Sequence, residues 1–221
     1  GPGRPGRAVS SRGRRVRGPM KTPYPAYDVL KKWDGPSFDT VTRGVIRRRL
    51  EAVPERRFFT AEEFRTLQAV AAGLTAQSQG AETVPVAPWI DADLFEGRGV
   101  GFRHEDLPPE RDVWCIGLAG IYAESRRRHG QAFADLAPDN QDAILRNVQA
   151  GEVAAGSFGS LPPPRVFTAI LSAVVGVYYA HPAAWSEIGF GGPASPRGYV
   201  RMGLDEHDPW EAQLSPGRGG S

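Results

Sequence analysis

RVFTAILSAVVGVYYA, residues 165–180, is apolar on nearly every side of the helix that it predicts. A helix that is apolar all round is buried on all sides, so we expect this segment to be the central helix of the fold. Its apolar run from Val166 to Ala180 is 15 residues long and includes Thr168 and Ser172. A membrane span needs about 20 apolar residues, so the segment predicts a core helix rather than a transmembrane one.

Amphipathic segments before this helix supply the layer that would pack around it. Apolar residues recur at helical spacing in four stretches, and no segment alternates between apolar and polar residues as a strand does. The four further helices are expected over about residues 38–50, 60–74, 110–129 and 138–150. We therefore predict an all-α protein in which about five helices form a small bundle.

The ends of these helices carry local signals. Ser37 is a candidate N-cap for the first helix, and Thr60 with Glu63 forms a capping box at the start of the second. Pro138 suits the first position of the fourth helix, although Ala137 before it offers no capping side chain. In the third helix, Gly117 and Gly120 lower the helix propensity, and we interpret them as sites where another backbone comes close.

Composition divides the chain into a body and arms. The 27 glycines and 20 prolines gather at the two ends and in the connection over residues 76–109, and the single Cys115 rules out an internal disulfide. We expect three parts: a disordered basic leader or added extension (1–19), a helical domain with an extended N-terminal arm (20–180), and an irregular C-terminal arm that wraps a partner (181–221).

Charge is concentrated in the leader. The chain has a formal net charge of +2, and without the six leader arginines the rest carries −4. A basic leader is compatible with binding to nucleic acid or an anionic surface, but it has no aromatic residue to stack on bases. Arg14-Arg15 would fit a twin-arginine export signal, but the residues that follow are not apolar. We expect a cytoplasmic protein.

Chemistry-bearing residues do not assemble into a recognisable site. No two of the four histidines have the spacing of metal ligands, and Asp91-Ala92-Asp93 lacks the rest of a calcium loop. Gly97-Arg98-Gly99-Val100-Gly101 has neither the spacing nor the preceding strand of a phosphate-binding loop. Cys115 lies on an apolar helical face and predicts an inert, buried thiol. We expect no catalytic, cofactor-binding or metal-binding residue in this chain, and therefore no enzymatic activity of its own.

Several motifs together resemble a known family. Residues 58–64 (FFTAEEF), 126–136 (RRRHGQAFADL), 141–145 (QDAIL), 178–182 (YYAHP) and 187–193 (EIGFGGP) resemble, in this order, the gluconate 2-dehydrogenase subunit 3 family over roughly residues 58–200. The resemblance implies a small, helical, non-catalytic subunit. Its partner would be a large FAD-dependent catalytic subunit of the glucose–methanol–choline type that oxidises sugars or polyols. Many family members carry a twin-arginine signal, so a periplasmic location is the alternative that the resemblance suggests.

The irregular arms are the expected contact surfaces for this partner; the alternative is that about half of their aromatic anchors pack on the chain's own helices. Trp, Tyr and Arg dominate the energetics of protein interfaces, and the arms at 22–36, 85–109 and 185–210 are rich in such anchors. The candidate partner-interface residues are Trp33, Trp89, Trp185, Phe190, Arg197, Tyr199 and Trp210. The alternative hypothesis is a helical nucleic-acid-binding or regulatory protein that uses its arginine clusters.

Overall fold

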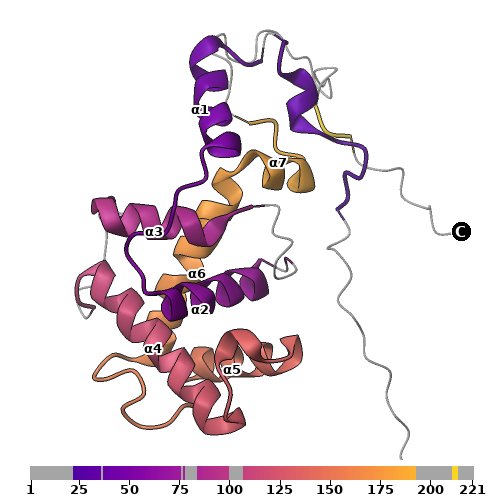
Figure 1. The fold of residues 1–221 in the computed structure, drawn as a ribbon. Helices are drawn as coiled ribbons and strands as arrows, with labels where there is room; N and C mark the ends of the chain where they lie inside the picture. The colour runs from indigo at the N-terminus through magenta and orange to yellow at the C-terminus, as the bar shows by residue number, and fades with distance from the viewer. Residues whose placement is uncertain are drawn as a thin grey trace, which may run out of the picture.

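The computed structural model describes residues 22–35, 37–75, 77, 84–99, 107–192 and 211–213. Within these residues the fold is all-α, as predicted, with no strand (Figure 1). The α-helices are α1 (Thr40–Glu51), α2 (Ala61–Leu74), α3 (Val86–Glu96), α4 (Glu110–His129), α5 (Pro138–Ala150), α6 (Pro163–Ala180) and α7 (Pro182–Ile188). Two short 3-10 helices, η1 (Val29–Lys32) and η2 (Phe133–Asp135), join them.

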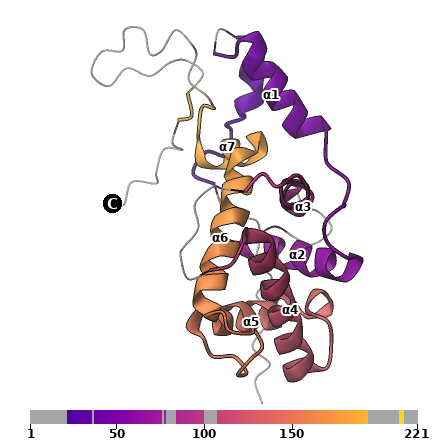
Figure 2. The same ribbon diagram turned by 90° about the vertical axis from the view of Figure 1, so that its left-hand side faces the viewer.

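Helix α6 is the central helix, as its composition predicts. It packs against α2, α3, α4, α5 and α7, and in Figure 1 it runs behind α2 and α3 from α7 toward α5. Figure 2 shows the same helix along one side of the others. Its fully buried side chains are those of Val166, Phe167, Ile170, Val174 and Tyr178. These belong to a main core to which every α-helix except α1 contributes.

Two helices are missing from the sequence-based count of five. Helix α3 lies in the segment that we expected to be a long connection, and α7 lies in the tail that we expected to be irregular. Pro88 stands in the first turn of α3 and Pro182 at the first position of α7, where the backbone N–H has no intrahelical acceptor. Proline therefore interrupts neither helix, and the expectation of a connection at α3 and of an irregular segment at α7 was wrong.

The predicted helix ends are mostly confirmed. Thr60 and Glu63 form the expected reciprocal capping box, α5 begins at Pro138, and Ala137 caps it without a side-chain hydrogen bond. The exception is α1, whose cap is Asp39 rather than Ser37: the Asp39 carboxylate accepts a hydrogen bond from Thr42 N–H at 2.7 Å. Ser37 is buried instead.

Close packing explains the two glycines of α4. A Cβ added to Gly117 would lie 2.8 Å from Val166 and 2.9 Å from Ile170, and one added to Gly120 would lie 2.7 Å from the ring of Phe158. The neighbours are thus side chains of α6 and of the loop before it, rather than the backbone that we expected. Carbon atoms repel one another at such distances, so both positions require glycine.

This packing predicts opposite effects of one substitution at two helical glycines. Gly120→Ala is expected to lower the free energy of unfolding by about 1–2 kcal/mol, because the methyl group overlaps Phe158. Gly176→Ala in α6 should raise it by about 0.5–1 kcal/mol, because no atom lies within 4 Å of that Cβ position and alanine favours the helix. Urea unfolding followed by circular dichroism measures both, and a stabilising Gly120→Ala would contradict the packing.

A second, smaller core lies at the end of the molecule that holds α1 and α7 (Figures 1 and 2). Its buried members are Val29, Phe38, Ile46 and Trp185, with Tyr27, Leu30, Trp33 and Leu50 partly buried around them. We call η1, α1 and residues 22–39 the N-terminal layer. This layer covers α7, which continues directly from the central helix.

No single helix among the described residues is long and apolar enough to cross a membrane. Helices α6 and α7 taken together have the length and apolar composition of a membrane span, but they are bent by 89° at their junction.

Candidate interaction surface

The described part of the N-terminal arm, residues 22–35, folds onto the chain itself. Thr22 Oγ1 donates a hydrogen bond to the carbonyl of Glu187 at 2.5 Å, and the backbone N–H of Val29 donates to Ser186 Oγ at 3.1 Å. The Lys32 ammonium donates to the carbonyl of Gly191, and the ring of Tyr24 packs against Gly189. Residues 22–35 therefore lie on α7 and the residues after it, which corrects the expectation that this arm is left for a partner.

Trp185 of α7 is buried in the second core, beneath the N-terminal layer. Its side chain is 3% exposed, and its indole N–H donates to the carbonyl of Tyr179 at 2.7 Å. Trp185 thus packs in the chain's own second core, although it stands in a segment rich in Gly and Pro. Its burial contradicts the prediction that it is exposed for contact with a partner. Trp33 is partly buried beside it, with its ring edge-on to Phe38 at 6.3 Å.

Of the other predicted partner-interface residues, two are at least partly exposed in the structure and three lie outside the described residues. Phe190 is 46% exposed and lies edge-on to Trp185, and Trp89 is half-buried on α3. Arg197, Tyr199 and Trp210 lie outside the described residues. The interface role of these residues stays a prediction.

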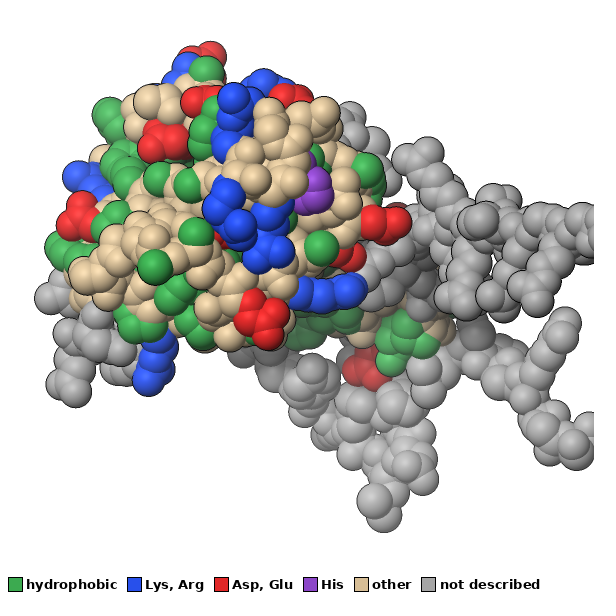
Figure 3. All heavy atoms as spheres, turned by 90° about the horizontal axis from the view of Figure 1, so that it is seen from below, with side chains coloured by type: hydrophobic (Ala, Val, Ile, Leu, Met, Phe, Trp, Pro, Cys, Tyr) green, Lys and Arg blue, Asp and Glu red, His purple; other side chains and the backbone are tan. Residues whose placement is uncertain are grey.

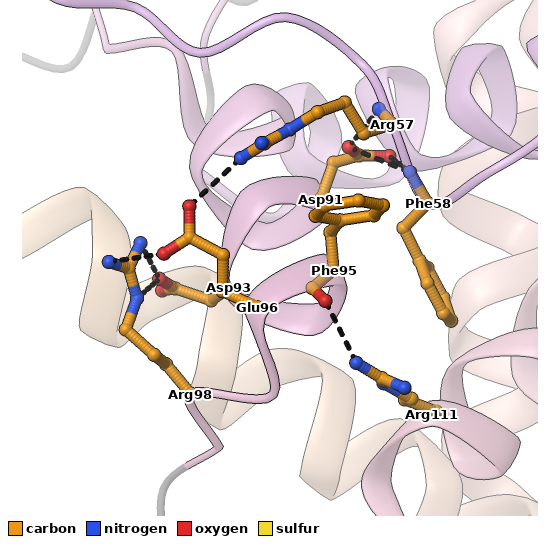
Figure 4. A network of polar contacts seen from close by, with 8 residues as sticks. All are labelled: Arg57, Phe58, Asp91, Asp93, Phe95, Glu96, Arg98 and Arg111. Carbon is orange, nitrogen blue, oxygen red and sulfur yellow. Dashed lines mark hydrogen bonds and ion pairs between the residues drawn. The ribbon is translucent and has the colours of Figure 1, made fainter.

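A buried carboxylate anchors the segment between α1 and α2. Asp91 is fully buried and accepts hydrogen bonds from three successive backbone N–H groups: Arg57 at 2.6 Å, Phe58 at 3.1 Å and Phe59 at 2.9 Å. Figure 4 shows the carboxylate pointing from α3 at this segment. The sequence contained a signal that we missed, because Asp91 stands on the apolar stripe of Ala87, Ile90 and Leu94 at helical spacing.

Around this anchor, arginines and aromatic rings form an exposed group that we call the α3 corner. It consists of Arg57, Phe58, Phe95, Arg98 and Arg111 (Figure 4). The guanidinium of Arg57 lies 4.4 Å from the centre of the Phe95 ring, and that of Arg111 lies 5.6 Å from the Phe58 ring. Phe95 remains 47% exposed.

The arginines of the α3 corner are held in fixed positions. Arg57 pairs with Glu96 at 2.9 Å, and Arg98 pairs with Glu96 at 2.6 Å and with Asp93 at 3.0 Å. Arg111 donates to the carbonyls of Leu94 and Phe95 at the end of α3. Side chains that are already ordered lose less conformational entropy on binding, so the corner is suited to contact another protein.

A second buried carboxylate organises the opposite end of the molecule. Glu124 on α4 is 1% exposed and accepts hydrogen bonds from Arg127 at 2.7 Å and Arg128 at 3.0 Å. It also accepts from the N–H of Ala154 at 2.8 Å and from Ser157 Oγ at 3.0 Å. Burial opposes its ionisation, but these hydrogen bonds outweigh burial and lower the pKa of Glu124 to about 2.

The arginine-rich motif that follows Glu124 is therefore largely structural. Arg126 donates to the carbonyl of Gly130, and Arg128 also donates to that of Glu152. The face at this end of the molecule shows Arg side chains, drawn in blue, gathered in one place with carboxylates close by (Figure 3). This arrangement gives no support to the nucleic-acid hypothesis, because internal partners engage the motif.

Two further ionisable groups in the interior, His181 and Tyr178, also bind within the chain. His181 contacts the carbonyl of Arg49 at 3.2 Å and accepts from Ala183 N–H, and burial lowers its pKa. Tyr178 donates to Glu187 at 2.6 Å, and burial followed by this carboxylate raises the tyrosine pKa. Cys115 is half-buried rather than buried as predicted, and its partial burial raises the pKa of the thiol, which disfavours the reactive thiolate.

Among the described residues, no group of three His, Cys, Asp or Glu side chains could hold a metal ion. A hollow of about 110 Å³ lies between α2 and α3, lined by residues that include Gln68, Gln77 and Pro88. Pockets for small organic ligands measure roughly 300–1,000 Å³, so this hollow is small for a sugar.

Comparison with known proteins identifies the family. The model of the gluconate 2-dehydrogenase subunit 3 family matches residues 61–192, which is more than half of the chain. The matched residues include every helix from α2 to α7. The chain belongs to the gluconate 2-dehydrogenase subunit 3 family, and the resemblance noted in the sequence is confirmed. Members are subunits of dehydrogenase complexes, so membership implies a partner within such a complex. No curated protein and no solved structure matches the chain.

Proposed function

We propose that this chain is a non-catalytic small subunit that binds and stabilises, or helps to mature, an FAD-dependent catalytic subunit that oxidises sugars or polyols. The family match carries this proposal, because it covers all the helices from α2 to α7, which form the main core. The partner type, of the glucose–methanol–choline class, comes from the sequence resemblance. The FAD would belong to that partner.

The buried ionisable groups bond to this chain's own backbone, which supports the proposal that the chain binds another protein rather than catalysing a reaction. Asp91 and Glu124 hold backbone segments of this chain, and His181 joins α7 to α1. These interactions stabilise the fold and leave the surface to mediate contact. The α3 corner has the composition of an interface centre, since arginine and aromatic residues are enriched there.

Co-expression with the candidate flavin-dependent subunit tests the proposal. The two chains should co-elute in size-exclusion chromatography with a flavin absorption spectrum, and the flavoprotein should be less soluble or less active when expressed alone. The proposal fails if the chains elute separately and the flavoprotein is equally soluble and active without this subunit.

Within such a complex, we expect Phe95→Ala to weaken binding about 5- to 30-fold, the range of an interface residue worth roughly 1–2 kcal/mol. Phe95 is 47% exposed in the free chain, so its removal should leave the melting temperature nearly unchanged. Tyr179→Ala, which removes a ring that is 38% exposed on α6, is the matched control. Equal affinities of the Phe95→Ala variant and the wild type, measured by titration calorimetry, would exclude the α3 corner from the interface.

A further inference from the structure

Helices α1, α6 and α7 meet at one buried imidazole. His181 directly follows the last residue of α6, caps the N-terminus of α7 and is 6% exposed. Its Nε2 lies 3.2 Å from the carbonyl oxygen of Arg49 in the last turn of α1, and its Nδ1 accepts a hydrogen bond from the N–H of Ala183 at 3.3 Å. One ring therefore bonds to the end of α1 and to the start of α7, at the point where the chain bends by 89°.

Arg49 completes a reciprocal contact between two helix ends. Its guanidinium donates to the carbonyl of Ala180, the last residue of α6, at 2.5 Å, while its own carbonyl faces His181. Carbonyl groups in the last turn of a helix have no intrahelical donor. The end of α1 and the junction of α6 with α7 thus each supply a donor that the other needs.

The two hydrogen bonds of His181 define the protonation state of the ring. The N–H of Ala183 can donate to Nδ1 only when Nδ1 carries no proton, and the carbonyl of Arg49 requires a proton on Nε2. The closed junction therefore holds a neutral imidazole with its proton on Nε2. A second proton, added at Nδ1, would face the N–H of Ala183 and remove the acceptor that caps α7.

The surroundings of the ring also disfavour a second proton. The titratable and charged groups in the adjoining turns are Arg47, Arg48, Arg49 and Glu51 on α1, Tyr178 and Tyr179 on α6, and Glu187 on α7. Glu187 accepts a hydrogen bond from Tyr178 at 2.6 Å, and Arg48 and Glu51 are exposed. Burial of the ring is the largest influence on the pKa of His181 and lowers it; the Arg49 carbonyl raises the pKa, the Arg49 charge lowers it, and the net result is a lowered pKa.

We propose that His181 is a pH-sensitive latch, which holds α1 on the junction of α6 and α7 when it is neutral and releases α1 when it is protonated. A buried imidazolium that faces an N–H donor is stabilised by reaching water, and for this the junction has to open. Opening loosens the end of α1 and the first turn of α7, and with them the N-terminal layer over Trp185. Helices α2 to α5 make none of the contacts of this latch, so they stay folded. The inference concerns this chain alone and does not depend on the proposed function.

Hydrogen exchange of the full chain, followed by mass spectrometry at pH 7.0 and pH 5.5, tests the latch. The closed junction binds the second proton less readily than the open one, so acid shifts the equilibrium toward the open form. After correction for the intrinsic pH dependence of exchange, the amides of α1 should lose protection about three- to eightfold between the two pH values. Titration of one histidine with a pKa near about 6.5 in the open form allows no more than about eightfold. The amides of α2 should keep their protection within about twofold.

Two substitutions remove the titration and keep one of the hydrogen bonds each. In His181→Asn, the side-chain oxygen can accept from the N–H of Ala183 in place of Nδ1. In His181→Gln, the side-chain amide can donate to the carbonyl of Arg49 in place of Nε2. Each variant should give α1 the same protection at both pH values, at a lower level than the wild type at pH 7.0, because one bond is lost.

His129→Asn is the matched control, because it makes the same change at an exposed histidine in the last turn of α4. It should keep the response of the wild type to acid. The latch is supported if this response persists in His129→Asn and disappears in both His181 variants.

Three results would overturn the latch. The protection of α1 in the wild type could change by less than about twofold between the two pH values, which is too little for release by one titrating group. Either His181 variant could lose protection on acidification as the wild type does, so that another group would be responsible. The amides of α2 could lose as much protection as those of α1, which would mean that acid unfolds the whole chain rather than opening the junction.

Discussion

Asp91→Asn is expected to lower the free energy of unfolding by about 3–4 kcal/mol, the largest effect that we predict for a single substitution. The carboxylate is fully buried and accepts from the backbone N–H groups of Arg57, Phe58 and Phe59. Asparagine offers one oxygen in place of two, and its NH2 group would face N–H donors. An amide oxygen in the place of Oδ1 could still accept from Phe58 and Phe59, but the N–H of Arg57, which bonds only Oδ2, would be left facing the NH2 group.

Urea unfolding at neutral pH measures this effect, and Asp93→Asn on the same helix is the control. Asp93 pairs with Arg98 at the surface, where an ion pair contributes about 0–1 kcal/mol. The two substitutions make the same chemical change two residues apart, so the difference between them isolates burial and backbone contact. A loss below about 1 kcal/mol for Asp91→Asn would contradict the anchoring role.

Glu124→Gln should lower the free energy of unfolding by about 2–3 kcal/mol at neutral pH, because charge-assisted hydrogen bonds are stronger than neutral ones. The substitution keeps the size of the side chain but removes the charge that binds Arg127 and Arg128. It also weakens the hold on Ala154 and Ser157 in the loop before α6. Asp142→Asn, which alters an ion pair with Arg146 at 3.7 Å, is the control and should cost less than about 0.5 kcal/mol.

The effect of Glu124 depends on pH in a defined direction. Its pKa is about 2 in the folded chain, against an ordinary value of 4.5, so folding favours the ionised form. The stabilisation is fully present above about pH 4.5 and is lost as the pH falls toward 2. The difference in stability between the wild type and Glu124→Gln should therefore shrink when unfolding is measured at pH 7, 4.5 and 3. A difference that stays constant over this range would contradict the lowered pKa.

These two carboxylates clarify the motifs that carry the family resemblance. The arginines of residues 126–136 hold Glu124, Gly130 and Glu152, and Gln141 donates to the carbonyl of Phe133 at 2.8 Å. The FFTAEEF motif combines the segment held by Asp91 with the capping box of α2. The motifs thus encode contacts that build the fold, and their residues need not contact the partner.

The sequence alone determined the elements that depend on local interactions. Residues 165–180 predicted the central helix from composition, and Thr60 with Glu63 predicted the start of α2 from a spacing of three residues. Such signals act between neighbours in the chain, so they can be recognised without the tertiary structure. Helix α3 could also have been found from its apolar stripe of Ala87, Ile90 and Leu94, which a proline in the first turn does not interrupt.

Only the tertiary structure decided the roles of Asp91, Glu124 and Trp185. Their partners are distant in sequence: Phe59 is 32 residues from Asp91, and Ala154 is 30 residues from Glu124. An acidic residue reads as a solvated charge until packing removes the water and supplies the donors. Likewise, a tryptophan in a segment rich in Gly and Pro reads as an exposed anchor until the N-terminal layer covers it. Local patterns fix where helices form, but burial depends on which segments meet.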